Sequence, residues 1–222
     1  MVLSMLDFIN PVIITKKLVN KFKYNKSTRR LTEEEMIMVK QNVEAYKDPS
    51  VRQNVLNWQY QPFLSNQEVA VFKQRTNVNI IYKGTSNKEN VFTDMKLISN
   101  IADRTFRVAL KEFENIKKTF PSYIIKVSGH SLGGSKALYI SKEKLVRAVV
   151  FNPFTPNTYG KMNTIVRNNP LINVNVNRDD MLSEKMIIIN PPGLNVFVIK
   201  GNRSLLINHS IDTYLDQNNF LF

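Results

Sequence analysis

Residues 123–134 decide the fold, and they read Tyr-Ile-Ile-Lys-Val-Ser-Gly-His-Ser-Leu-Gly-Gly. The apolar first half is typical of a buried strand, and the residues that follow, 135–140, favour a helix. Ser131 has a glycine two residues before it and another two residues after it. This Gly-x-Ser-x-Gly spacing is typical of a nucleophile elbow, a strand-to-helix turn so tight that bulkier neighbours would clash. A glycine-rich turn without chemistry is the alternative interpretation, because so short a pattern also occurs by chance.

An elbow would place two functional groups side by side. The turn lifts the hydroxyl of Ser131 clear of the sheet, which makes it a candidate nucleophile. The next residue, Leu132, would begin the helix, where backbone N–H groups point outward and favour negative charge. The sequence therefore predicts that the N–H of Leu132 contributes to an oxyanion hole.

The rest of the chain alternates helices and strands. Thr32 and Glu35 form a capping-box pattern that predicts a helix through about Tyr46, with Met36, Val39, Val43 and Tyr46 on its buried face. A β-hairpin is expected over 67–82 and a helix over 91–118. Later strands are expected at 146–151, 172–176 and 195–199, and a final helix at 210–215. Alternation of this kind predicts an α/β fold, α/β-hydrolase-like, with a mainly parallel sheet flanked by helices.

Composition narrows the possible chemistry. The chain has 222 residues, enough for one well-buried core, so we expect a single domain over 31–222 preceded by a basic arm at 1–30. It has no cysteine, which excludes disulfides, thiolate catalysis and cysteine-based zinc sites. With only 2 histidines a histidine-rich metal cluster is excluded as well. We expect the chemistry to need neither a metal nor an organic cofactor.

The net charge of +13 favours anionic partners. Seven of the basic residues fall between positions 16 and 30, directly after an apolar stretch. An apolar segment beside a basic cluster is typical of attachment to an anionic membrane surface, although an ordinary solvated arm is the alternative. Nucleic acid is not the expected partner, because no basic motif interleaved with aromatic residues is present.

The chain's location is expected to be cytoplasmic or peripheral to a membrane. No signal peptide pattern and no stretch of roughly 20 apolar residues occurs in the sequence. The abundance of lysine and asparagine would suit a large DNA virus or another AT-rich genome.

A serine nucleophile needs a base, and the base needs a carboxylate to orient it. His130 adjoins Ser131 inside the elbow, where its side chain should point away from the hydroxyl, so His209 is the candidate base. The acid is expected after the strand 172–176, at the carboxyl edge of the sheet, where Asp179 and Asp180 both qualify. Their order along the chain, serine, acid, histidine, is that of α/β-hydrolases.

These segments together resemble the class 3 (fungal-type) lipases, over roughly residues 60–217. The residues 129–134, Gly-His-Ser-Leu-Gly-Gly, match that family's elbow, and 80–86 are similar to its strand that ends in Arg-Gly-Thr, with Lys83 in place of the arginine. The residues 177–183 resemble its acid loop, and 209–215 resemble the segment that begins with its histidine. The resemblance implies that Asp180 is the triad acid and that the backbone N–H of Thr85 is the second oxyanion donor.

The expected function is therefore that of a serine esterase or lipase. Ser131, Asp180 and His209 would hydrolyse carboxylic ester bonds of lipids, either acylglycerols or phospholipids, with Thr85 and Leu132 as the oxyanion hole. A catalytically silent hydrolase fold that binds lipid, membrane or a protein partner is the alternative. The sequence leaves acyl chain length and oligomeric state open.

Overall fold

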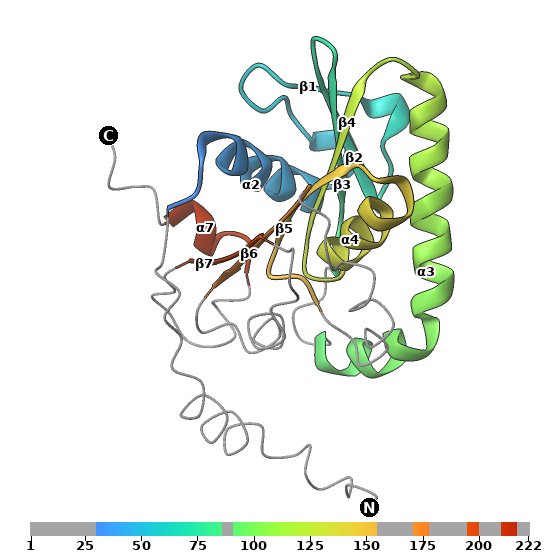
Figure 1. Ribbon diagram of the computed structural model, residues 1–222, viewed down its shortest axis with the longest axis vertical. Helices are drawn as coiled ribbons and strands as arrows, with labels where there is room; N and C mark the ends of the chain where they lie inside the picture. The colour runs from blue at the N-terminus through green and yellow to red at the C-terminus, as the bar shows by residue number, and fades with distance from the viewer. Residues whose placement is uncertain (1–29, 86–90, 155–170, 178–194, 200–209, 217–222) are drawn as a thin grey trace, which may run out of the picture.

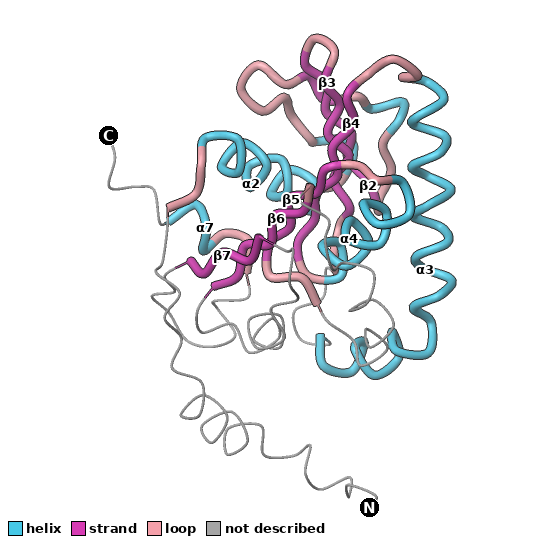
Figure 2. Tube along the Cα trace, in the orientation of Figure 1, coloured by secondary structure: helices cyan, strands magenta, loops and turns pink. Residues whose placement is uncertain are grey.

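The computed structural model describes residues 30–85, 91–154, 171–177, 195–199 and 210–216. These residues form three layers, with helices on both faces of one central sheet (Figure 1). Within the described residues the sheet has seven strands, whose order in space is their order along the chain. The strands form one continuous twisted band (Figure 2).

The sheet is mainly parallel, as predicted. The first three strands, β1 (Gln59–Tyr60), β2 (Val69–Gln74) and β3 (Asn77–Tyr82), pair antiparallel. From β3 onward every pair is parallel, through β4 (Ile124–His130), β5 (Arg147–Phe151), β6 (Ile172–Asn177) and β7 (Asn195–Ile199). The hairpin β2–β3 was predicted from its sequence pattern and is confirmed, whereas the two-residue strand β1 was not expected.

Two helices cover one face of the sheet. They are α3 (Val91–Thr119) and α4 (Leu132–Lys144), and each follows a parallel strand that it connects to the next. Ala109 and Phe113 of α3 and Leu138 of α4 are buried in the main core cluster against the side chains of β2 to β6. Both helices occur where the sequence predicted them.

The opposite face carries α2 (Glu33–Tyr46) and the short helix α7 (Thr213–Asp216). Met38 of α2 and Tyr214 of α7 are fully buried beside Phe151 of β5. The predicted final helix thus exists, but it begins at Thr213 because residues 210–212 form a turn whose carbonyls accept from the first N–H groups of α7.

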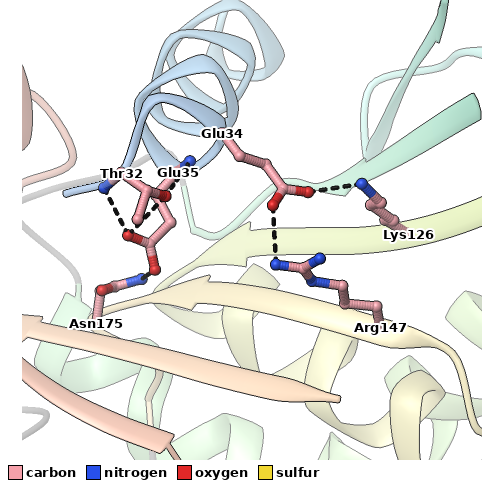
Figure 3. A network of polar contacts seen from close by, with 6 residues as sticks. All are labelled: Thr32, Glu34, Glu35, Lys126, Arg147 and Asn175. Carbon is pink, nitrogen blue, oxygen red and sulfur yellow. Dashed lines mark hydrogen bonds and ion pairs between the residues drawn. The ribbon is translucent and has the colours of Figure 1, made fainter.

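The start of α2 confirms the predicted capping box. The Glu35 backbone N–H donates to the hydroxyl of Thr32, and the carboxylate of Glu35 accepts from the Thr32 N–H at 2.9 Å. The same carboxylate accepts from the Nδ2 of Asn175 on β6 at 3.3 Å (Figure 3). One residue earlier, Glu34 pairs with Lys126 of β4 and Arg147 of β5. The helix is therefore fastened to the sheet by its acidic first turn.

The buried face of α2 is more polar than the sequence pattern predicted. Of the four apolar residues expected there, Val39 is fully buried, while Met36, Val43 and Tyr46 are half-buried at the edge of the cluster. Fully buried positions include Gln41 and Asn42. Gln41 accepts from the side-chain amide of Asn79 at 2.9 Å, and Asn42 donates to the hydroxyl of Ser128 at 3.0 Å. The polar side chains of the helix and the sheet therefore face one another.

Several predictions concern residues that lie outside the described ones. The basic cluster at 16–30, except for Arg30, is among them, and so are Asp179, Asp180 and His209. Among the described helices, none combines the length and the apolar character that a membrane span requires. The division into a basic arm and a single domain stays a prediction.

Candidate active site

Ser131 lies in the turn between β4 and α4, as the elbow pattern predicted. Its backbone has φ 56° and ψ −125°, a conformation that residues with a side chain rarely adopt. Backbone hydrogen bonds hold it there: the Ser131 N–H donates to the carbonyl of Phe151, and the Ser131 carbonyl accepts from Phe154 at 3.0 Å. Such locally strained residues are found where surrounding structure fixes them, and frequently at functional sites.

The glycines of the elbow are required by close backbone contacts. A Cβ added to Gly133 would lie 1.9 Å from the carbonyl oxygen of Tyr82, at the end of β3. A Cβ added to Gly129 would lie 2.2 Å from the carbonyl oxygen of Gly133. Distances this short exclude any side chain, so the two glycines that flank Ser131 allow α4 to begin directly against the sheet.

The neighbouring histidine of the elbow, His130, contacts helix α2. The Nδ1 of His130 lies 2.9 Å from the hydroxyl of Tyr46, and the two rings meet edge to face. His130 is 5% exposed, and its contact with Tyr46 shows that its ring faces α2. This contact agrees with the expectation that its side chain points away from the nucleophile, and it gives His130 a structural partner instead.

The end of β3 lies beside Ser131. A Cβ built on Gly84 would be 3.3 Å from the Cβ of Ser131 and 2.7 Å from the carbonyl oxygen of His130. Thr85, the predicted second oxyanion donor, follows directly and is half-buried. Leu132, the predicted first donor, is the first residue of α4, where a helix offers no partner to a backbone N–H. The fold therefore brings the segments of Ser131, Leu132 and Thr85 together.

The ends of β5 and β6 meet next to this site. The N–H of Asn152 donates to the carbonyl of Asn175, and the hydroxyl of Tyr214 contacts both residues, at 2.8 Å from Oδ1 of Asn152 and 3.0 Å from the carbonyl of Asn175. Through Tyr214, the start of the final helix is attached at the carboxyl edge of the sheet. Asp180 and His209, the predicted acid and base, lie outside the described residues, so their contacts with Ser131 stay a prediction.

Two polar residues near the end of β3 were not found by the sequence analysis. Lys136 of α4 is 4% exposed, and its ammonium group lies 2.7 Å from the carboxylate of Glu68 and 3.3 Å from the carbonyl of Lys83. Glu112 of α3 accepts from Asn66 at 2.9 Å, and burial raises the pKa of its carboxyl group above the ordinary value. Neither residue belongs to a motif, and a lysine in a helix usually indicates a solvated face.

A metal centre is not formed by the described residues. No group of three or more histidine, aspartate or glutamate side chains among them is placed to hold a metal ion. What the described part of the site offers is a serine hydroxyl beside backbone N–H groups, a combination suited to nucleophilic attack on a carbonyl group.

Comparison with known proteins finds likeness in structure and none in sequence. No protein-family model matches the chain, and no curated protein matches it by sequence. Among solved structures, it is similar to a triacylglycerol lipase whose catalytic centre is described as a serine protease triad, with 14% identity, a TM-score of 0.47, and coverage of 69% of this chain and 75% of the other. It is also similar to the native propeptide complex of Rhizomucor miehei lipase, with 13% identity, a TM-score of 0.48, and coverage of 73% and 70%. Likeness at this level carries no information on activity or substrate.

Proposed function

We propose that this protein is a serine hydrolase that cleaves carboxylic ester bonds of lipids. The observation that carries the proposal is the backbone of Ser131, held at φ 56° between a parallel strand and a helix. Ordinary turns with this conformation usually have glycine at the position, because a side chain there is strained. In an elbow it has a function, because it presents the hydroxyl at the edge of the sheet beside the first N–H of the helix.

In the sequence, the acid and the base proposed for Ser131 lie only a few residues from elements at the same edge of the sheet. Asp180 comes three residues after Asn177, the last residue of β6. His209 directly precedes Ser210, whose carbonyl accepts from the backbone N–H of Thr213 at the start of α7. Because β6 and α7 are both attached beside the end of β5, short connections suffice to bring an acid and a base to the nucleophile.

The proposed reaction has two halves. His209 takes the proton of the Ser131 hydroxyl while Oγ bonds to the ester carbonyl carbon, and Asp180 stabilises the imidazolium that forms. The imidazolium then protonates the leaving alcohol as the carbon–oxygen bond to it breaks. In the second half, water attacks the acyl-serine by the same route and releases the carboxylic acid, which restores the free serine.

The negative charge that develops on the carbonyl oxygen requires fixed donors. We assign this role to the backbone N–H groups of Leu132 and Thr85. Removal of one such donor typically costs about 3 kcal/mol of transition-state stabilisation. The backbone of this site is closely packed, since a Cβ added to Gly84 or Gly133 would lie only 2.5 Å or 1.9 Å from its nearest neighbour. Donors held in place by packing are effective because they need little reorganisation during the reaction.

Lipid esters are the proposed substrate class because of the motif resemblance and the basic cluster at 16–30. A positively charged arm would hold the enzyme at anionic phospholipid headgroups. Comparison of binding to vesicles of neutral phosphatidylcholine with binding to vesicles containing phosphatidylserine tests this part. Equal binding to both would remove the support for a phospholipid substrate and leave the ester chemistry untouched.

An active-site probe tests the central proposal. A fluorophosphonate should label the purified protein once, with the mass increase expected for loss of fluoride and a bond to Oγ of Ser131. Ser131→Ala should not be labelled, while Ser122→Ala, which removes an exposed hydroxyl before β4, should be labelled like the wild type. A folded wild-type protein that fails to react would refute the hydrolase proposal and favour a silent binding module.

Hydrolysis of p-nitrophenyl esters of increasing acyl length then defines the substrate. Phospholipid vesicles and emulsified triacylglycerol, assayed side by side, separate the two lipid classes. Ser131→Ala serves as the blank in each assay.

A further inference from the structure

The peptide group between Lys83 and Gly84 is held from two sides by side chains of different helices. Its carbonyl oxygen accepts a hydrogen bond from the ammonium group of Lys136, on α4, at 3.3 Å. Its N–H, which belongs to Gly84, hydrogen bonds the hydroxyl of Tyr46, the last residue of α2. The close approach of Tyr46 is clear from the position of a Cβ built on Gly84, which would lie 2.5 Å from that hydroxyl oxygen.

Each of the two side chains is itself anchored. The ammonium group of Lys136 also pairs with Glu68 at 2.7 Å, and the backbone carbonyl of Glu68 accepts from the N–H of Lys83 at 2.8 Å. The hydroxyl of Tyr46 accepts from Gly84 and can donate its own proton to Nδ1 of His130, 2.9 Å away. Lys136 therefore links helix α4 to this peptide group, and Tyr46 links His130 of the elbow to the same group.

This arrangement matters because the next peptide group carries the N–H of Thr85. Gly84 lacks a side chain, so its backbone can rotate freely unless its surroundings prevent it. Only two torsions, φ and ψ of Gly84, join that peptide to the one that carries the Thr85 N–H, so a shift of the Lys83–Gly84 peptide would displace the donor as well. Hydrogen bonds to both ends of the Lys83–Gly84 peptide oppose such a shift.

We propose that Lys136 and Tyr46 are positioning residues that orient the backbone N–H of Thr85 by fixing the Lys83–Gly84 peptide. The proposal rests on the proposed hydrolase function, in which Thr85 is an oxyanion donor. Neither residue touches the substrate. A buried lysine in the elbow helix has a physical explanation here, since burial of an ammonium group is costly unless it is paired and hydrogen-bonded.

The catalytic test compares Lys136→Met and Tyr46→Phe with matched controls. Lys144→Met removes another lysine of α4 that pairs with a glutamate, Glu114, and Tyr60→Phe removes a hydroxyl in β1. We expect kcat on a p-nitrophenyl ester to fall about tenfold or more in each test variant, with KM within about twofold of wild type, since a misplaced oxyanion donor weakens transition-state binding selectively. The two controls should keep the wild-type kcat.

A second measurement is independent of catalysis. The chain has 7 glycines, and labelling with ¹³C-carbonyl lysine and ¹⁵N-glycine selects amides in Lys-Gly pairs, which occur only at 83–84 and 200–201. Gly201→Ala identifies the Gly84 signal by removing the other. In Tyr46→Phe, exchange of the Gly84 amide hydrogen with solvent should accelerate about tenfold, as expected for loss of one hydrogen bond.

The outcomes separate this inference from the function on which it rests. Faster exchange at Gly84 together with a lower kcat and constant KM supports both. Unchanged exchange, or faster exchange with an unchanged kcat, overturns the positioning role. An inactive wild-type protein would refute the hydrolase proposal, and the exchange rate would still decide whether Tyr46 holds the peptide.

Discussion

The hydroxyl of Tyr214 lies 2.8 Å from Oδ1 of Asn152, in a fully buried contact between the final helix and the end of β5. Asn152 itself has a positive φ of 40° and lies two residues before Phe154, whose N–H donates to the Ser131 carbonyl. The contact thus joins the segment that follows His209 to the backbone that supports the nucleophile. Four chain positions separate His209 from the first residue of α7.

Tyr214→Phe should therefore affect both stability and turnover. Removal of the hydroxyl leaves buried acceptors without that donor, which typically costs about 1–3 kcal/mol. We also expect kcat to fall, because the segment carrying His209 is less firmly attached. Thermal unfolding and ester hydrolysis measure the two effects. Tyr60→Phe, on the far strand β1, is the control, and a Tyr214→Phe variant as stable as that control would contradict the prediction.

Gly133→Ala should prevent normal folding, whereas Gly134→Ala should be tolerated better. The added Cβ meets backbone at 1.9 Å in the first case, and its nearest neighbours are atoms of Pro153 at 3.1 Å in the second. Overpacking typically costs about 1–3 kcal/mol, and a backbone clash should exceed that range. Soluble yield and the urea midpoint of each variant check this order. Equal stability of the two would show that α4 can move away from β3.

The backbone of Ser131 predicts a difference between two inactive variants. Both Ser131→Ala and Ser131→Gly lack the nucleophile, but only glycine adopts φ 56° without a steric penalty. Relief of the strained backbone should stabilise Ser131→Gly over Ser131→Ala by about 1 kcal/mol. The greater freedom of glycine in the unfolded chain offsets part of this gain, so the net difference should be smaller but still favour glycine. Urea denaturation measures the difference. A more stable alanine variant would mean that the elbow is not strained.

Glu112 gives a prediction about pH. Burial raises the pKa of its carboxyl group in the folded state, and the hydrogen bond from Asn66 lowers it by less. The folded protein therefore binds this proton more tightly than the unfolded chain, and stability from this group is greatest below the unfolded pKa and is lost as pH rises through the folded pKa. Glu112→Gln keeps an acceptor for Asn66 and does not titrate.

The melting temperature of Glu112→Gln, relative to wild type, should consequently increase between pH 4 and pH 8. A difference that stays constant over this range would show that Glu112 ionises equally in both states. Glu114→Gln, on the same helix and paired with Lys144, serves as the comparison.

The capping box of α2 can be tested by two substitutions of different cost. Thr32→Ala removes the N-cap acceptor and should cost about 1 kcal/mol. Glu35→Ala removes the reciprocal bond and also the partner of Asn175 on β6, so it should cost more. Chemical denaturation ranks the two. The reverse order would mean that the link to β6 contributes nothing.

Much of the fold could be predicted from local pattern. The hairpin β2–β3, the helix α3 and the elbow follow from alternation, apolar periodicity and glycine spacing, which act over a few residues. The polar face of α2 could not be predicted, because Gln41 and Asn42 are buried only by virtue of Asn79 and Ser128 on strands far along the chain. Apolar periodicity contains no information about such pairs.

The candidate site also has residues that the sequence predicted and residues that only the structure reveals. Ser131 and Leu132 were predicted from the elbow motif, in which backbone geometry fixes which residue types fit. Thr85 was predicted only from the resemblance to the class 3 lipases. Lys136 and Tyr46 could not be identified from motifs, because each is recognisable only by contact with the Lys83–Gly84 peptide. In sequence, one is a lysine in a helix and the other is the last aromatic residue of an amphipathic segment.

The agreement between strand order and chain order has a consequence for biosynthesis. Each strand from β2 to β7 pairs with the one made just before it, so the sheet can grow by addition at one edge as the chain leaves the ribosome. Sequential neighbours also shorten the loops that must close, which favours fast folding. The elbow and the segments packed around it, from Tyr46 to Phe154, are translated before the segment of His209. A nascent chain would thus complete the scaffold of the nucleophile before it acquires the residue proposed to activate it.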